Sequence, residues 1–183
     1  MNNMVVKILE LFKHISRDIM IYVIPGFVIV VNLFIIDELY LNNKILGLIE
    51  KLEYLSFIIF ILTYVIGHII MALMEIVQRI VKCINLEKNN VFKVEVKIFK
   101  KNKELYDYFI ERQNQLSYFR WTLSGAFIIT SIINIFYKYI EKVNISLYFI
   151  FLPLIIEISL LILHYVTEKE YKEKVNTIKT LYT

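Results

Sequence analysis

Four long runs of apolar residues divide the chain. They cover Ile19–Ile36, Leu55–Met74, Trp121–Tyr137 and Ile145–Val166. Each run is close to the ~20 residues that a helix needs to cross the ~30 Å hydrocarbon core of a bilayer. The first run is longer than the apolar part of a typical cleaved signal and is not followed by small residues at a cleavage site. The pattern therefore predicts four membrane-spanning helices.

The segments between the runs have shorter patterns of their own. Residues 4–17 place apolar side chains at helical spacing opposite charged ones, which predicts an amphipathic helix lying in the membrane interface. In the central connector, Ile76–Asn85 continues the second run as helix, whereas Val91–Phe99 alternates apolar and charged residues and predicts a short strand. Lys103–Arg120 again has helical spacing and leads into the third run.

The distribution of basic residues predicts how the spans are oriented. Of the 21 Lys and Arg residues, 17 lie before the first run, in the central connector or after the fourth run, and only four lie in the other two connections. Because Lys and Arg are retained on the cytoplasmic side, both termini and the central connector should be cytoplasmic. The expected fold is an all-α membrane protein, a four-transmembrane-helix bundle with a cytoplasmic extension between spans two and three.

This fold divides the chain into five parts. They are an interfacial amphipathic helix (1–18), a first transmembrane hairpin (19–74), a cytoplasmic connector (75–120), a second transmembrane hairpin (121–166) and a cytoplasmic tail (167–183).

Composition agrees with a membrane protein and excludes several other classes. The chain has 183 residues, of which 58% are hydrophobic, against roughly 45–50% in ordinary soluble domains. Its mean hydropathy is +0.60. Its one cysteine, Cys83, cannot build a disulfide framework and is expected to be a reduced thiol. The sequence has no phosphate-binding loop, dinucleotide fingerprint, metal-ligand pattern or nucleophile motif, so we expect neither an enzyme nor a cofactor or metal site.

Ionisable residues within the apolar runs are the main candidates for a functional site, because such groups are costly at membrane depth and usually find a partner. Spans two and four each carry a His and a Glu seven residues apart: His68 with Glu75, and Glu157 with His164. Seven residues return nearly to the same face of a helix, and His68 and Glu157 have matching depths. We predict intramembrane polar pairs between His68 and Glu157 and between Glu75 and His164. They would either fix the register of two helices or form a polar track for protons, ions or gating.

Two further features carry a structural and a functional interpretation each. Pro25 and Gly26 in the first span predict either a static kink or a hinge used in gating. A basic cytoplasmic patch is either a solvated face that sets topology or a binding surface for anionic lipid or a nucleotide; it consists of Lys97, Lys100, Lys101 and Lys103. Nothing interleaves aromatic and Arg residues as nucleic-acid modules do, so nucleic acid is not expected as a partner.

An apolar stripe in the connector predicts assembly. One chain can hardly cover it alone, so we expect a homo-oligomer, for example a tetramer, in the lipid bilayer; the predicted oligomer contact is Leu105, Phe109, Leu116 and Phe119.

The first two spans resemble those of a group of known proteins. Arg17-Asp18 followed by Tyr22-x-x-Pro25-Gly26-Phe27, and then Tyr64-x-x-Gly67-His68, is similar to small four-span membrane proteins of bacterial anti-phage systems. These include the membrane component of Kiwa and four-span effectors of cyclic-nucleotide and CRISPR-linked defence. The resemblance implies a homo-oligomer of the inner membrane that senses infection or perturbs the membrane, with a cytoplasmic partner protein. The alternative is a structural or regulatory membrane subunit that recruits a soluble partner through the basic connector.

Overall fold

The computed structural model describes residues 11–41, 54–84, 97–102 and 106–182. Within these ranges every regular element is a helix. The main elements are η1 (Ile19–Val23), α2 (Ile24–Tyr40), α4 (Leu55–Ile84), η2 (Tyr106–Glu111), α7 (Arg112–Tyr139) and α8 (Leu147–Tyr182). Four helices are long and apolar enough to cross a membrane, Leu11–Tyr40, Leu55–Ile80, Phe109–Tyr139 and Leu147–Val175, and each contains most or all of one predicted span. The four long apolar helices and the all-helical class are thus confirmed.

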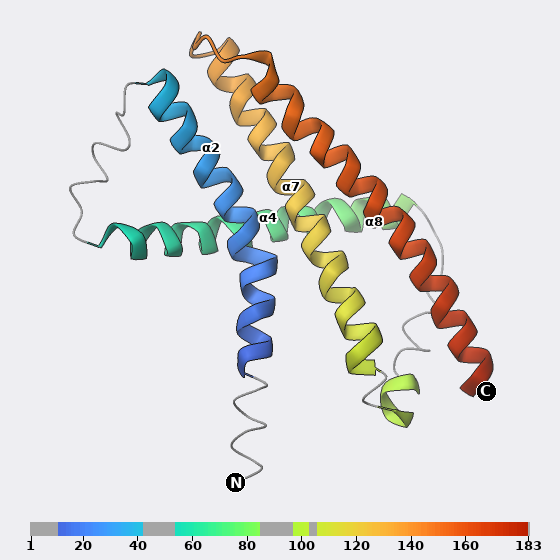
Figure 1. Cartoon of the computed structure of the whole chain (residues 1–183). Helices are drawn as coiled ribbons and strands as arrows, with labels where there is room; N and C mark the ends of the chain where they lie inside the picture. The colour runs from blue at the N-terminus through green and yellow to red at the C-terminus, as the bar shows by residue number, and fades with distance from the viewer. Residues whose placement is uncertain (1–10, 42–53, 85–96, 103–105, 183) are drawn as a thin grey trace.

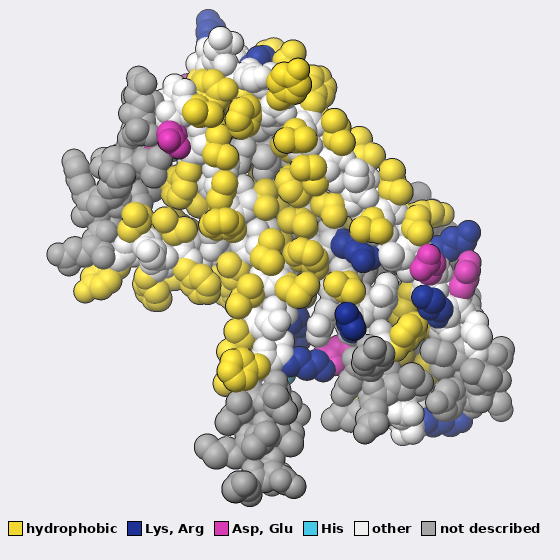
Figure 2. Space-filling view, in the orientation of Figure 1, with side chains coloured by type: hydrophobic (Ala, Val, Ile, Leu, Met, Phe, Trp, Pro, Cys, Tyr) yellow, Lys and Arg dark blue, Asp and Glu magenta, His cyan; other side chains and the backbone are white. Residues whose placement is uncertain are grey.

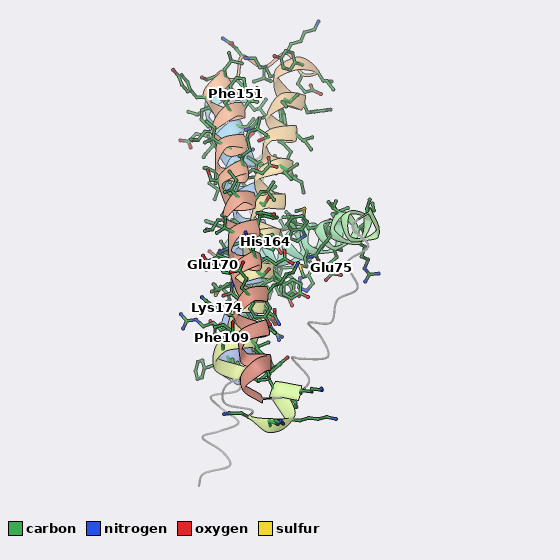
Figure 3. All side chains as sticks on the ribbon, turned by 90° about the vertical axis from the view of Figure 1, so that its right-hand side faces the viewer. Glu75, Phe109, Phe151, His164, Glu170 and Lys174 are labelled. Carbon is green, nitrogen blue, oxygen red and sulfur yellow. The ribbon has the colours of Figure 1, made fainter. Side chains whose placement is uncertain are left out.

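The four helices are not aligned as we expected of a bundle. Helices α2, α7 and α8 run side by side, whereas α4 lies across them in both views (Figure 1, Figure 3). Helix α8 packs along α7, and α4 packs chiefly against α2 and the start of that span. Both described ends of the chain lie toward the lower ends of the three aligned helices (Figure 1).

The crossing of α2 and α4 is a contact between two backbones. A Cβ atom added to Gly26 would lie 1.8 Å from the carbonyl oxygen of Thr63, and one added to Gly67 would lie 1.9 Å from that of Tyr22. Glycine is the one residue that lets two helices approach so closely. These two glycines explain how α4 crosses the first span so closely.

One buried cluster joins the crossing to the third helix. Ile29 of α2, Ile70 and Met74 of α4, and Ala126 of α7 are all buried together. The indole Nε1 of Trp121 donates to the Met74 carbonyl oxygen at 2.9 Å, which ties α7 to α4. The apolar cluster and this hydrogen bond place α4 against α2 and α7 at one level.

The first long helix begins before the predicted span. Residues 11–18 are helical and continue through η1 into α2 without a break. The described part of the predicted interfacial helix over 4–17 is therefore helical, but it is not separated from the span. The wide π turn of η1 ends at Val23, two residues before Pro25, which cannot donate to the preceding turn.

A second, smaller cluster forms beyond the apolar spans. Ile98, Ile110, Tyr171 and Val175 are buried together from three segments of the chain. Residues 97–101 are helical, so the predicted strand Val91–Phe99 is wrong over 97–99, and 91–96 lie outside the described residues. The alternation of apolar and charged residues is too short to distinguish a strand from a helix. In the structure this segment is a helix, and Ile98 is its buried residue.

The last helix is longer than the fourth span. Helix α8 continues to Tyr182, so residues 167–182, which we expected as a tail, extend the span as helix. Its lower part packs near η2, since the Phe109 and Tyr171 rings lie 6.2 Å apart. Apolar side chains cover the middle of the visible face, and Lys, Arg, Asp and Glu gather toward the lower end of α7 and α8 (Figure 2). The surface is that of a protein with an apolar belt and a charged end.

Candidate functional site

A line of polar residues follows α7 where it packs against α8. The residues are three, four or seven positions apart, which keeps them on one helical face. We call this line the α7 polar stripe; it consists of Ser117, Arg120, Ser124, Ser131, Asn134 and Lys138. Three of the six are hydrogen-bonded to α8, Lys138 is hydrogen-bonded to Ile145 just before α8, and Ser124 and Ser131 are buried.

At the upper end of the stripe, one amide joins three helices. Pro153 has no N–H to donate, so the carbonyl of Phe149, four residues earlier in α8, lacks its helical partner. The Asn134 Nδ2 donates to this carbonyl oxygen at 2.5 Å, and the Asn32 Nδ2 of α2 donates to the Asn134 Oδ1 at 2.9 Å. Both Asn side chains are buried. Because an unsatisfied carbonyl costs several kcal/mol in lipid, this relay stabilises the contact of α2, α7 and α8.

One more polar contact lies above this relay. The Lys138 ammonium donates to the carbonyl of Ile145, which closes the turn between α7 and α8. In that turn, Lys142 has a φ of 54°, a left-handed conformation that reverses the chain. The short segment between α7 and α8 therefore reverses the direction of the chain.

At the lower end of the stripe, His164 is buried between α7 and its own helix. Its Nδ1 lies 3.3 Å from the Ser117 Oγ, and its Nε2 lies 3.7 Å from a Glu168 carboxylate oxygen. The Trp121 ring centroid is 5.3 Å from that of His164. One turn along, the Arg120 guanidinium donates to the Thr167 hydroxyl at 2.7 Å. At this end of the stripe, the titratable side chains of His164, Glu168 and Arg120 contact other protein side chains.

The middle of the stripe is lined by small hydroxyl groups. The buried Ser124 Oγ and, on the neighbouring face of α7, Thr130 Oγ1 have no hydrogen-bond partner among the described residues. Ser131 donates to the Phe127 carbonyl of its own helix. The described side chains therefore do not form a continuous hydrogen-bonded chain from His164 to Asn134, and proton transfer along the stripe would need water between them.

The second polar cluster lies where α4 crosses the first span. The His68 ring is stacked on the Tyr22 ring with centroids 3.7 Å apart, and the Tyr64 and His68 centroids are 4.4 Å apart. His68 Nδ1 lies 3.1 Å from the Tyr64 carbonyl oxygen. The His68 side chain remains exposed on its outer side. These three residues belong to the motifs on which the resemblance rests, so the structure brings the two motifs together.

The predicted pair of His68 and Glu157 is not what the geometry presents. His68 stacks on Tyr22 of the first span, and Glu157 has no hydrogen bond or ion pair with another described residue. His164 has Ser117 and Glu168 among its partners. Glu75 lies on α4, one residue after the Met74 carbonyl that Trp121 binds, and His164 lies on α8 beside the Trp121 ring (Figure 3). The prediction assumed that spans two and four run side by side, whereas α8 packs along α7.

The predicted hinge has a specific packing role. Pro25 and Gly26 are both buried, and Gly26 is in backbone contact with α4. The contact supports the static interpretation, since a hinge at this point would have to separate two helices that touch.

The predicted surface residues fall into two groups. Lys97, Lys100 and Lys101 are exposed, and Lys103 lies outside the described residues. Of the predicted oligomer contact, Leu105 is outside the described residues, Leu116 and Phe119 are half-buried, and Phe109 packs against the small cluster of its own chain. The chain thus covers part of this stripe itself.

The sequence interpretation did not include the α7 polar stripe, although the regular intervals between its residues can be recognised in the sequence. We searched the spans for charged residues and His, and so passed over Ser117, Ser124, Ser131 and Asn134. A search for small polar residues at intervals of three, four and seven would have found them. Asp37 was also missed: it was placed in a connection, but it lies at the end of α2 and is fully buried.

The described residues contain no group of three or more His, Cys, Asp or Glu side chains that could hold a metal ion. In comparisons with known proteins, no family model, no curated protein and no solved structure matches this chain.

Proposed function

We propose that this chain is a multi-pass protein of the bacterial inner membrane that acts on the membrane itself, as a homo-oligomeric effector or sensor in anti-phage defence. The defence assignment rests on the resemblance of the motifs around Tyr22 and His68. The membrane location rests on the four long apolar helices. Both termini are proposed to be cytoplasmic because of the positive-inside bias.

The observation that carries an action on the membrane is the α7 polar stripe. A lipid-anchoring helix needs no buried hydroxyls and amides along one face, yet α7 has them from Ser124 to Asn134, and the buried His164 of α8 lies against Ser117. Polar groups inside a membrane protein commonly mark a path for ions, protons or water, or hold helices together. We propose that the contact between α7 and α8 opens to water when the protein is active.

The exposed polar side of α4 supports assembly into an oligomer. His68 is exposed in the single chain, although it lies on a helix that is otherwise largely apolar. A second copy would cover it from lipid. The size of the assembly stays a prediction.

The alternative function is recruitment of a soluble partner. The observation that favours it is that Lys97, Lys100 and Lys101 are exposed on a helical segment anchored by the buried Ile98. A positively charged helix fixed at the end of the molecule is suited to bind an acidic protein surface.

The proposal is tested by expressing the chain together with its neighbouring genes in a phage-sensitive host. Infection should depolarise the membrane, as measured with a potential-sensitive dye, and should reduce plaque formation. Ser124→Ala and Ser131→Ala remove only a hydroxyl from the stripe and should weaken both effects. Ile158→Ala, on the exposed side of α8, is the matched control and should leave both unchanged. If protection persists without depolarisation but is lost on replacing Lys97, Lys100 and Lys101 by Gln, recruitment is the correct function.

A further inference from the structure

Glu157 is a carboxyl group in the middle of an apolar helix. It lies ten residues after Leu147 and nine before Val166, and no other Asp, Glu, Lys or Arg occurs between those two positions of α8. In the part of the chain that the structure describes, Glu157 has no hydrogen bond or ion pair. A carboxylate without a counter-ion is costly at membrane depth. The groups that face Glu157 therefore determine which form of this carboxyl group the protein can hold.

Glu157 lies on the side of α8 that packs against α7. The two helices run side by side along this part of the molecule (Figure 1). Glu157 is half-buried and lies four positions after the buried Pro153 and seven before the buried His164. The next residue, Ile158, is 55% exposed. The carboxyl group is thus on the same face of α8 as His164, which contacts α7.

The contact between Ser117 and His164 sets which residue of α7 faces Glu157. The Ser117 Oγ lies 3.3 Å from the His164 Nδ1. A step of seven residues along each of two antiparallel helices advances two turns and returns nearly to the same faces. From Ser117 and His164, this step leads to Ser124 on α7 and to Glu157 on α8. The register therefore places Ser124 opposite Glu157.

The Ser124 hydroxyl is a buried group that needs a partner. Its side chain is fully buried, and its Oγ has no hydrogen-bond partner among the described residues. Burial of a hydroxyl without a hydrogen bond is unfavourable. Between Arg120 and Lys138, α7 has no charged residue, and the nearest titratable group on α8 is His164, two turns away. Glu157 therefore faces a hydroxyl group and no counter-ion.

We infer that Glu157 and Ser124 form a proton-binding site in the middle of the α7–α8 contact. In the closed contact, the protonated carboxyl group donates its O–H to the Ser124 Oγ. When the contact opens to water, the carboxyl group releases this proton to water on one side and takes another from water on the other side. The inference deepens the proposed function and rests on it for this exchange, in which protons are the species that crosses the membrane.

The site fits a proton better than a metal ion. Hard cations such as Ca²⁺ and Mg²⁺ take six or more oxygen ligands. One carboxyl group and one hydroxyl supply fewer, and no group of three or more His, Cys, Asp or Glu side chains among the described residues adds to them. A single proton needs one donor oxygen and one acceptor oxygen, which Glu157 and Ser124 provide.

Disulfide formation tests whether Ser124 and Glu157 face each other. In a Cys83→Ser background, Ser124→Cys is combined with Glu157→Cys or, as the matched control, with Ile158→Cys on the exposed side of α8. A disulfide requires Cβ atoms about 4 Å apart. Mild oxidation in membranes should join positions 124 and 157 within one chain, as mapped by mass spectrometry. An equal or greater yield with position 158, or no disulfide with position 157, would overturn the register.

Labelling with dicyclohexylcarbodiimide tests for the bound proton. This apolar carbodiimide adds to a protonated carboxyl group and does not react with a carboxylate. The full-length protein in weakly alkaline buffer should be labelled at Glu157, and the labelling should disappear in Glu157→Gln and fall as the pH is raised further. Absence of labelling at Glu157 would overturn the inference. Protection by NaCl but not by choline chloride at the same pH would show that the site holds Na⁺ and not a proton.

The variant Ser124→Ala tests the part played by the hydroxyl. Loss of the acceptor makes the acid form less favourable, so the midpoint of labelling against pH should shift to lower pH. Ser159→Ala is the matched control, because Ser159 is exposed on α8 and donates to the Ile155 carbonyl of its own helix. An unchanged or raised midpoint in Ser124→Ala, or the same shift in both variants, would overturn the role of Ser124.

These measurements are made without phage, so they separate the site from the proposed function. Labelling of Glu157 without depolarisation on infection would retain the site and refute the proposed function. Depolarisation that persists in Glu157→Gln would instead overturn the assignment of protons as the species that crosses the membrane.

Discussion

Adding one methyl group at the crossing of α2 and α4 should separate the two helices. Gly26→Ala would place a Cβ atom 1.8 Å from the Thr63 carbonyl oxygen, and Gly67→Ala would place one 1.9 Å from that of Tyr22. Both obstacles are backbone atoms of a helix, so neither can rotate away. Gly125→Ala is the matched control, because its Cβ atom would meet the flexible Met74 side chain.

The size of the effect follows from these distances. A Cβ atom closer than 3.0 Å to another heavy atom is essentially never observed, so the backbones must separate by at least 1.2 Å at Gly26 and 1.1 Å at Gly67. Overpacking costs about 1–3 kcal/mol when a core can adjust, and a rigid displacement also opens the cluster around Ile29. We expect each substitution to lower the free energy of unfolding by about 3 kcal/mol. For Gly125→Ala, the ~1 kcal/mol by which Ala is preferred to Gly in a helix offsets part of the clash.

The single tryptophan makes the effect measurable. Trp121 donates to the Met74 carbonyl of α4, so its fluorescence reports whether α4 is docked. Unfolding by SDS in mild detergent should shift to lower SDS fractions for Gly26→Ala and Gly67→Ala, with red-shifted emission before unfolding. The double variant should cost much less than twice a single one, because the first methyl group has already separated the helices. Wild-type midpoints and emission in both single variants would refute a backbone contact at this crossing.

Three further predictions concern individual contacts. Asn134→Leu should lower the free energy of unfolding by about 1 kcal/mol or more. The loss should be smaller in a Pro153→Ala background, because the backbone N–H of residue 153 can then donate to the Phe149 carbonyl. A double-mutant cycle by SDS unfolding measures the difference, and additive effects would contradict the relay. Trp121→Phe should lower stability by about 1 kcal/mol through loss of its hydrogen bond to α4, as measured by thermal unfolding followed by circular dichroism, and an unchanged midpoint would exclude that bond. Lys13→Ala removes an ion pair whose side chains are 43% and 28% exposed; a midpoint change beyond about 1 kcal/mol would show that this pair is stronger than exposed pairs usually are.

The long apolar helices could be predicted from the sequence because their signal is local. A run such as Leu55–Met74 is recognised from composition and length alone. The direction in which α4 crosses α2 is a different kind of property, since it depends on Gly26 and Gly67 meeting across 41 positions of the chain. A single sequence does not say which glycine faces which helix. The same holds for the segment 97–101, whose helical state accompanies the packing of Ile98 on α8.

The candidate site was predictable only where a residue is conspicuous in an apolar run. His68 and His164 were singled out on that ground, and both lie in polar clusters of the structure. Their partners were not predictable, because matching depths identify residues at one level but not helices that touch. Asn134 acquires its role from Pro153 on another helix. Such a dependence appears only once α7 and α8 are placed side by side.

The bond between Asn32 and Asn134 also has a consequence for biosynthesis. Its two residues are 102 positions apart. At about 5–20 residues per second, roughly 5–20 s of translation separate the appearance of Asn32 from that of its partner. During that interval the first helix is inserted with an amide that only water, lipid headgroups or the translocation machinery can satisfy. A chain truncated before α7 would keep this amide exposed at membrane depth, and we expect such fragments to associate with one another or to be degraded by membrane proteases.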